Sequence, residues 1–117
     1  MWVCLSNAFF SIVDPEDGSN NLRVRARRKG DIERVFPKAK VERTPGRDYL
    51  YRAHIDRDLV AQAIADQVRS IDYNNFKNSV RDDKLHSAYG SFWHTHSRLQ
   101  EIPPYSTRRH SRQGDLL

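Results

Sequence analysis

The chain has 117 residues, and its 20 Lys and Arg outnumber its 15 Asp and Glu, so the formal net charge is +5 at pH 7. This length suits one domain with a single hydrophobic core. With 38% hydrophobic and 30% charged residues, the composition argues against both a membrane protein and a wholly disordered chain.

The lone cysteine, Cys4, cannot form a disulfide within the chain, which favours a reducing compartment. Residues 1–13 have no basic start and are interrupted by polar side chains, so they do not fit a signal peptide. No stretch approaches the ~20 apolar residues that a membrane-spanning helix needs. We therefore expect a cytoplasmic protein with no membrane partner.

The first two predicted elements are strands. Residues 5–13 are rich in aromatic and β-branched side chains and end at the turn-forming residues 14–21. Residues 22–27 alternate strictly, with Leu22, Val24 and Ala26 on one face and Arg23, Arg25 and Arg27 on the other. The two strands are expected to form a hairpin.

A short helix and a second pair of strands follow. Residues 30–36 predict two helical turns, with Asp31 as the N-cap and Pro37 at the far end. Residues 40–43 predict a weak strand, and a turn then precedes a strand at 49–55. Alternation in this last strand places Tyr49, Tyr51, Ala53 and Ile55 on one face and Leu50, Arg52 and His54 on the other.

The rest of the chain predicts helices. Asp56 is expected to cap a helix that ends near Ile71, and a break at Asp72 separates it from helices at 73–80 and 83–99. The first helix carries a stripe of side chains expected to pack on the core: Leu59, Val60, Ala63, Ile64, Gln67, Val68 and Ile71. The last carries a similar stripe: Leu85, Ala88, Tyr89, Phe92, His96 and Leu99.

This order of elements, ββαββαα, predicts an α+β fold, in which an antiparallel four-stranded sheet has its helices packed on one face. Residues 1–102 are expected to form a single domain. Residues 103–117 are expected to form a basic, flexible tail that holds Arg108 and Arg109.

Several segments are distinctive as strings: FFSIV at 9–13, LRVRAR followed by GDIERVFP within 22–37, TPGRDYLYRA at 44–53, and IDYNNFK with AYGSFW within 71–93. Together they resemble a family of small bacterial proteins. The resemblance covers most of residues 1–94 and implies a bacterial, cytoplasmic protein. The family has no assigned activity, so the resemblance assigns no catalytic residue, cofactor or partner.

The strongest functional signal is the location of the positive charge. Residues 22–43 hold nine Lys and Arg against three Asp and Glu, a net charge of +6, while the rest of the chain sums to −1. The predicted alternation gathers Arg23, Arg25, Arg27, Arg52 and His54 on one sheet face. Such a face could bind phosphates or an acidic protein surface, or it could simply be a solvated face that protects an edge. Because Tyr49 and Tyr51 alternate toward the predicted core, the aromatic platform that single-stranded nucleic acid requires is missing.

The segment 71–77 has two interpretations. It can be a junction between helices, in which Asp72 caps and the aromatic residues pack. It can also be a recognition loop that exposes Tyr73, Asn74 and Lys77. Trp93 falls outside the predicted stripe of its helix and is a candidate anchor for a partner.

Catalytic and metal sites have weaker support. His94 and His96 are two residues apart on a predicted helix and point away from each other, so no metal site is expected. Tyr51, Arg52, His54 and Asp56 could form an acid–base cluster of the ribonuclease-toxin kind, although His54 as a surface residue and Asp56 as a cap explain the same pattern. No glycine-rich phosphate loop is present, and no cofactor is expected.

We therefore expect a small non-enzymatic protein that occupies an acidic protein or nucleoprotein surface, as an inhibitor or modulator of a larger bacterial complex. Size and fold type alone make it comparable with the anti-CRISPR class of phage proteins. The alternatives are a nucleic-acid-binding regulator that uses the basic sheet face and, third, a ribonuclease-like toxin. The expected binding residues are Arg23, Arg25, Arg27, Arg28, Arg52, His54, Tyr73, Asn74, Lys77, Trp93, Arg108 and Arg109.

Overall fold

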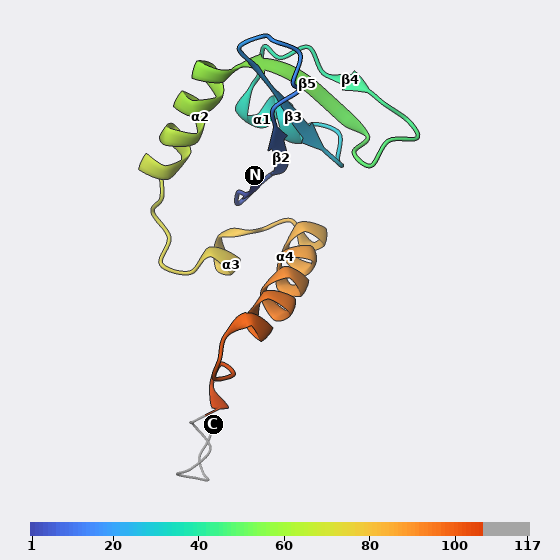
Figure 1. Ribbon diagram of the computed structural model, residues 1–117. Coiled ribbons are helices and arrows are strands. Elements are labelled where there is room, and N and C mark those ends of the chain that lie inside the picture. Colours follow the sequence, from blue (N-terminus) through green and yellow to red (C-terminus); the bar gives the residue numbers. More distant parts are fainter. Residues whose placement is uncertain (107–117) are drawn as a thin grey trace.

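The structure, a computed structural model, describes residues 1–106 and has an α+β fold. Its five-stranded antiparallel sheet has the order β1-β2-β3-β5-β4 (Figure 1). The strands are β1 (Trp2–Cys4), β2 (Phe9–Val13), β3 (Asn21–Ala26), β4 (Glu42–Arg43) and β5 (Tyr51–Asp56). The expected α+β class and antiparallel sheet are confirmed, but the expected number of strands was one too few.

The additional strand is β1, which precedes the segment 5–13 that was expected to form the first strand. Residues 5–8 form a turn instead, closed by a 2.9 Å hydrogen bond from the Leu5 N–H to the Ala8 carbonyl. Ser6 and Asn7, which readily adopt turn conformations, lie at its centre. The turn allows Trp2–Cys4 to fold back and pair with Phe9–Ser11, so β1 becomes an edge of the sheet.

The first hydrophobic core lies on one face of the sheet. The strands contribute Phe10, Ile12, Val24, Ala26, Ala53 and Ile55. Ile32 of α1 (Asp31–Val35), the following Phe36, and Val60 of α2 (Arg57–Arg69) cover them. The alternation expected for residues 22–27 agrees with this arrangement, since Val24 and Ala26 are fully buried.

The N-termini of the first two helices differ in how they are capped. Asp56 caps α2 as expected, because its carboxylate accepts hydrogen bonds from the N–H groups of Asp58 and Leu59. Asp31 is not the cap of α1. Gly30 holds that position with a φ of 93°, which favours glycine, and Asp31 is the first residue of the helix. The Asp31 side chain is buried instead and accepts a 3.2 Å hydrogen bond from the Phe9 N–H.

Helices cover both faces of the sheet, and not one face as expected. A second cluster, made of Phe9, Tyr49, Val80, Leu85 and Tyr89, lies on the face opposite Phe10. It includes residues of α4 (Asp83–His96) and packs against Phe76 of α3 (Phe76–Ser79). The reason is local, because neighbouring strand residues point to opposite faces and Phe9 and Phe10 are both large and apolar.

The stripes expected on the helices are only partly buried. On α2, Val60 is buried, but Leu59 and Val68 remain about three-fifths exposed, and Ile71 beyond the helix is half exposed. On α4, Leu85 and Tyr89 are buried, whereas Phe92 is 41% exposed. The reason is visible in Figure 1, where α2 extends beyond the sheet and the lower half of α4 projects away from it. Within residues 1–106, no helix is both long and apolar enough to cross a membrane.

Candidate functional site

The arginines of β3 and β5 share one face of the sheet, but two of them bind other side chains of the chain. Arg25 lies opposite Arg52 across the two strands. Arg52 is only 7% exposed and donates a 2.8 Å hydrogen bond to the Asp48 carboxylate. Arg25 donates to Ser11 Oγ at 2.6 Å and approaches Asp48 at 3.7 Å. Because Asp48 lies between two like charges, it offsets the repulsion that this pairing would cause, and the expectation of an exposed Arg52 was wrong.

Tyr49 lies on this basic face and not in the first core, where it was expected. It precedes β5, and its ring is covered by the guanidinium groups of Arg25 at 4.6 Å and Arg27 at 4.1 Å. Such cation–π contacts stabilise the two positive charges close together. Since Tyr49 is only 4% exposed, it presents no surface on which a base could stack.

The remaining part of this face does not assemble the expected acid–base cluster. His54 is exposed, and its Nε2 accepts a 3.1 Å hydrogen bond from Arg23 Nε. Asp56 is used as the α2 cap, and Tyr51 points to the opposite face because it alternates with Arg52. The groups that a ribonuclease-like mechanism would combine are therefore not brought together in this arrangement.

Arg28 connects the sheet to α4 and does not join the exposed basic face. Its guanidinium lies 3.3 Å from the buried Asp31 carboxylate and 3.1 Å from that of Asp82, the N-cap of α4. Burial alone would lower the pKa of Arg28, but the charge of Asp31 and the contact with Asp82 raise it. The Leu85 N–H and then Arg28 hold the pKa of Asp82 below its usual value.

Tyr89 holds α4 against the turn that joins β1 and β2. Its hydroxyl lies 2.9 Å from the Leu5 carbonyl and 2.8 Å from the Ala8 carbonyl, and it donates to both. Burial raises the pKa of Tyr89 well above its ordinary value, so the hydroxyl keeps its proton.

The Tyr89→Phe substitution is expected to lower the free energy of unfolding by about 1–3 kcal/mol, because the partly buried Leu5 carbonyl loses its donor and the Ala8 carbonyl keeps only the Leu5 N–H. Urea denaturation monitored by tryptophan fluorescence measures the change. Tyr73→Phe is the matched control, since no hydrogen bond of its hydroxyl is found among the described residues. Equal stability of the two variants would contradict this role of Tyr89.

Aromatic side chains form a continuous exposed surface where β1 meets α4. The Trp2 ring stacks on Phe92 with centroids 6.2 Å apart, and both rings contact Phe9. Trp2 is 69% exposed and Trp93 is 43% exposed. Lys77 Nζ lies 5.1 Å from the centre of the Trp93 ring. We call Trp2, Phe92 and Trp93, together with Leu99, which lines the same hollow as these three, the aromatic surface.

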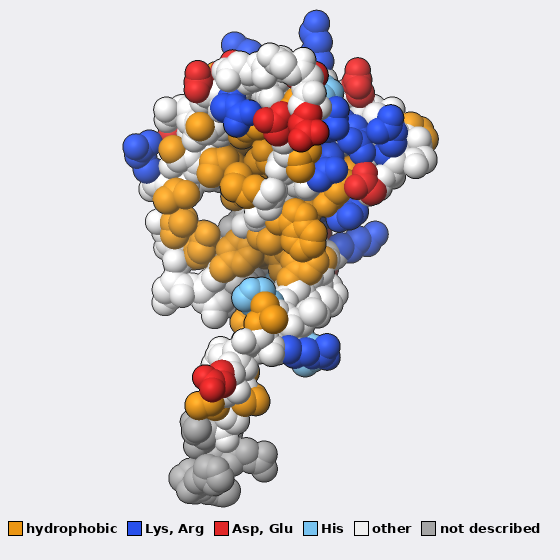
Figure 2. Space-filling model, in the orientation of Figure 1, with side chains coloured by type: hydrophobic (Ala, Val, Ile, Leu, Met, Phe, Trp, Pro, Cys, Tyr) orange, Lys and Arg blue, Asp and Glu red, His pale blue; other side chains and the backbone are white. Residues whose placement is uncertain are grey.

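This surface borders a hollow of about 680 Å³, which we call the aromatic groove. Its other lining residues are Cys4, Phe76, Lys77, Tyr89, Thr95, His96, Ser97, Gln100 and Pro104. Figure 2 shows hydrophobic side chains gathered over the middle of this face, between α2 and the lower part of α4. Lys77 and His96 are the only ionisable side chains of the lining besides Cys4 and Tyr89, and no carboxylate is among the described residues that form it.

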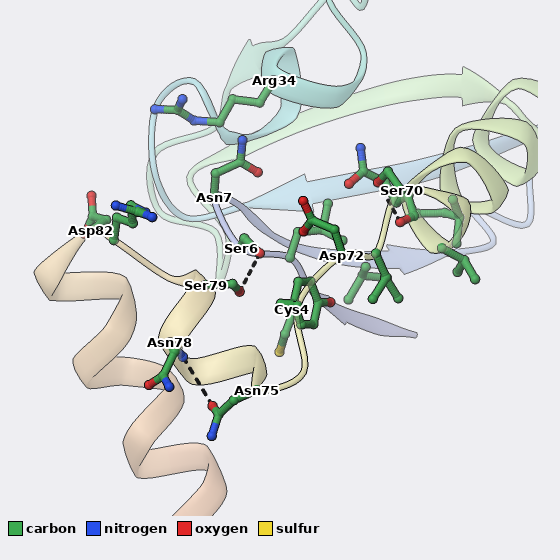
Figure 3. Close-up of a pocket in the computed structure, with 18 of the residues that line it drawn as sticks. Cys4, Ser6, Asn7, Arg34, Ser70, Asp72, Asn75, Asn78, Ser79 and Asp82 are labelled. Atoms are coloured by element: carbon green, nitrogen blue, oxygen red, sulfur yellow. Dashed lines mark hydrogen bonds between the residues drawn. The ribbon is translucent and has the colours of Figure 1, made fainter.

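A second hollow, of about 900 Å³, lies between α2, β1 and the segment that leads to α3, and we call it the polar cleft. Tyr73 and Asn74 line it, as do Asn75 and Asn78. Figure 3 shows Arg34 and Asn7 at one end of the cleft and Ser70 of α2's C-terminus at the other, with Cys4 between them. The expected recognition segment is therefore divided, because Tyr73 and Asn74 line the polar cleft while Lys77 lines the aromatic groove.

Sequence reasoning missed the main apolar part of this region. Trp2 was not considered because β1 was not expected, and Phe92 was assigned to the core. Arg34 was counted in the basic segment of residues 22–43 but was not among the expected binding residues. Arg108 and Arg109 lie outside the described residues.

The described part of the chain holds no group of three or more His, Cys, Asp and Glu side chains that could bind a metal ion together. No family model, curated protein or solved structure was found to match the chain.

Proposed function

We propose that this chain is a small non-enzymatic protein that binds a partner protein through the aromatic surface. Under this proposal, the protein acts in the cytoplasm as an inhibitor or modulator of a larger bacterial complex. The observation that carries it is the exposure of Trp2, Phe92 and Trp93 beside a groove that no part of the described chain fills. Clustered exposed aromatic residues mark protein interfaces, where Trp and Tyr supply much of the binding energy.

The charge of the aromatic groove indicates the chemistry of the partner. Lys77 lies over Trp93, and His96 lines the same groove without a carboxylate beside it. A complementary surface would combine apolar side chains with Asp or Glu at its rim. Arg23 and Arg27, which remain on the accessible side of the basic face, would steer an acidic partner toward this surface.

The proposal is tested by affinity capture from bacterial lysate, in which nuclease-treated and untreated halves are compared. The wild-type protein is expected to retain one partner protein at fixed stoichiometry in both halves. With that partner purified, Trp93→Ala is expected to weaken binding by roughly 30-fold or more, because a central tryptophan is a typical hot spot. Leu59→Ala is the matched control, since Leu59 is also an exposed apolar residue but lies outside the groove.

Two results would overturn the proposal. Recovery of nucleic acid alone, lost after nuclease treatment and weakened by Arg27→Ala, would favour the nucleic-acid-binding regulator. Cell killing that depends on His54 would favour the ribonuclease-like toxin.

A further inference from the structure

The outer edge of β1 presents main-chain groups without a partner. Met1 and Ile12 exchange two hydrogen bonds, both of 2.8 Å, and the Leu5 N–H donates to the Ala8 carbonyl. In an antiparallel pair, the residues that bond to the neighbouring strand alternate with residues whose N–H and C=O point the other way. Met1, Val3 and Leu5 therefore face β2, and Trp2 and Cys4 direct their main-chain groups outward. No hydrogen bond from these outward groups is found among residues 1–106.

This edge opens into the two hollows already described, because Cys4 lines both the polar cleft and the aromatic groove. Ile64, Val68 and Ile71 form an apolar wall of the polar cleft on the α2 side of the sheet. Trp2 and Phe92 form an apolar wall on the other side. A strand placed beside β1 would therefore contact apolar side chains on both of its faces.

From this arrangement we infer that β1 accepts an extended segment of the partner protein as a sixth strand of the sheet. The inference rests on the proposed function, since it specifies how the partner binds. The two N–H and two C=O groups of Trp2 and Cys4 require an occupant with a free peptide backbone, which an extended segment supplies. Its side chains would alternate between the wall of α2 and the aromatic surface.

The charges of the polar cleft define one end of this segment. Arg34 lies near Asn7 at one end of the cleft in Figure 3, and Arg81, Asp72 and Asp82 also line the cleft. Arg34 reaches Asp31 only at 4.0 Å, and no carboxylate lies within 4 Å of Arg81 among the described residues. The segment that fits is therefore apolar in its middle and carries an Asp, a Glu or a terminal carboxylate at the end near the two arginines.

A second copy of this chain is a less suitable occupant. α2 and the segment of residues 70–75 border the edge of β1, as the close-up in Figure 3 shows. A volume of about 900 Å³ is within the range of ligand pockets and holds a short segment but not a folded sheet with its helices.

The test uses linear decapeptides that are selected from a phage-displayed random library on the full-length protein and then synthesised. Enriched peptides are expected to be apolar with an acidic residue near one end. Methylation of the peptide nitrogens one at a time is expected to weaken binding tenfold or more at every second position, because a strand bonds to β1 through alternate residues. Hydrogen exchange of the Trp2 and Cys4 amides should be fast in the free protein and slow in the complex.

Two variants of the protein complete the design. Cys4→Pro removes an outward N–H while leaving the bonds to β2, a position in which an edge strand tolerates proline. It is expected to weaken peptide binding roughly tenfold relative to Cys4→Ala, which removes the same side chain but keeps the N–H.

Each contrary outcome has a distinct meaning. If no peptide is enriched, or if the effect of methylation does not alternate along the peptide, the inference of an added strand is wrong. Peptide binding that depends on Trp93 but not on the Cys4 N–H would overturn it too and leave the proposed function in place. A dimer that Cys4→Pro converts to a monomer would show that a second copy occupies the edge. Strand binding that withstands Trp93→Ala would count against the proposed function but not against this inference.

Discussion

Phe10→Ala is expected to lower the free energy of unfolding by about 3–5 kcal/mol, the cost of removing a large aromatic side chain from a packed core. Phe10 lies at the centre of the first core, is completely buried, and packs on Phe36 with ring centroids 6.0 Å apart. A domain of this size has a total stability of about 5–15 kcal/mol, so this loss would consume a large part of it. Urea denaturation gives the difference in the free energy of unfolding.

Leu99→Ala is the matched control for Phe10→Ala. Leu99 is also apolar, but 78% of it is exposed, so its removal should change stability by less than about 0.5 kcal/mol. If Phe10→Ala were as stable as Leu99→Ala, the core assigned to this face of the sheet would be wrong.

Asp31→Ala is expected to lower the free energy of unfolding by about 2–4 kcal/mol, because it removes a buried carboxylate that three groups use. The carboxylate accepts the Phe9 N–H, binds Arg28 at 3.3 Å and lies 4.0 Å from Arg34. Without it, the Phe9 N–H loses its acceptor and Arg28 keeps only its contact with Asp82. Thermal and urea unfolding measure the loss.

Two further variants separate the roles of Asp31. Asp31→Asn keeps an acceptor for the Phe9 N–H and removes the charge, so its stability should lie between those of the wild type and Asp31→Ala. Glu33→Ala, on the exposed side of the same helix, should be within about 0.5 kcal/mol of the wild type. A stability of Asp31→Ala equal to that of Glu33→Ala would show that the buried ion pair contributes nothing.

Asp31 also illustrates a limit of sequence reasoning. Short polar residues before a helical pattern commonly cap the helix, and Asp56 does so because its carboxylate accepts the N–H groups of Asp58 and Leu59. At the earlier helix, Gly30 takes the cap position, and the Asp31 carboxylate turns toward Phe9 and Arg28. Nothing in the local sequence of residues 30–36 indicates that contact, because Phe9 is 22 residues away.

The candidate site shows the same limit at larger scale. The alternation of Arg23, Arg25 and Arg27 predicted a common face with Arg52 and His54, and the register of β3 and β5 has that arrangement. Whether those arginines are free was not predictable, because Asp48 and Tyr49 reach them from a loop. Trp93 was expected to be an anchor, but the aromatic surface around it was not predictable, because β1 was not expected and Phe92 was assigned to the core.

The sequence by itself determined the α+β class, the positions of β3, β5 and α2, and the shared face of the arginines, because these depend on side-chain periodicity and on a cap within one segment. Only the tertiary structure decided that helices cover both faces, that Arg52 is buried, and that Trp2 and Phe92 meet beside an open strand edge. These features depend on contacts between residues far apart in the chain, where packing and the pairing of charges outweigh the local pattern.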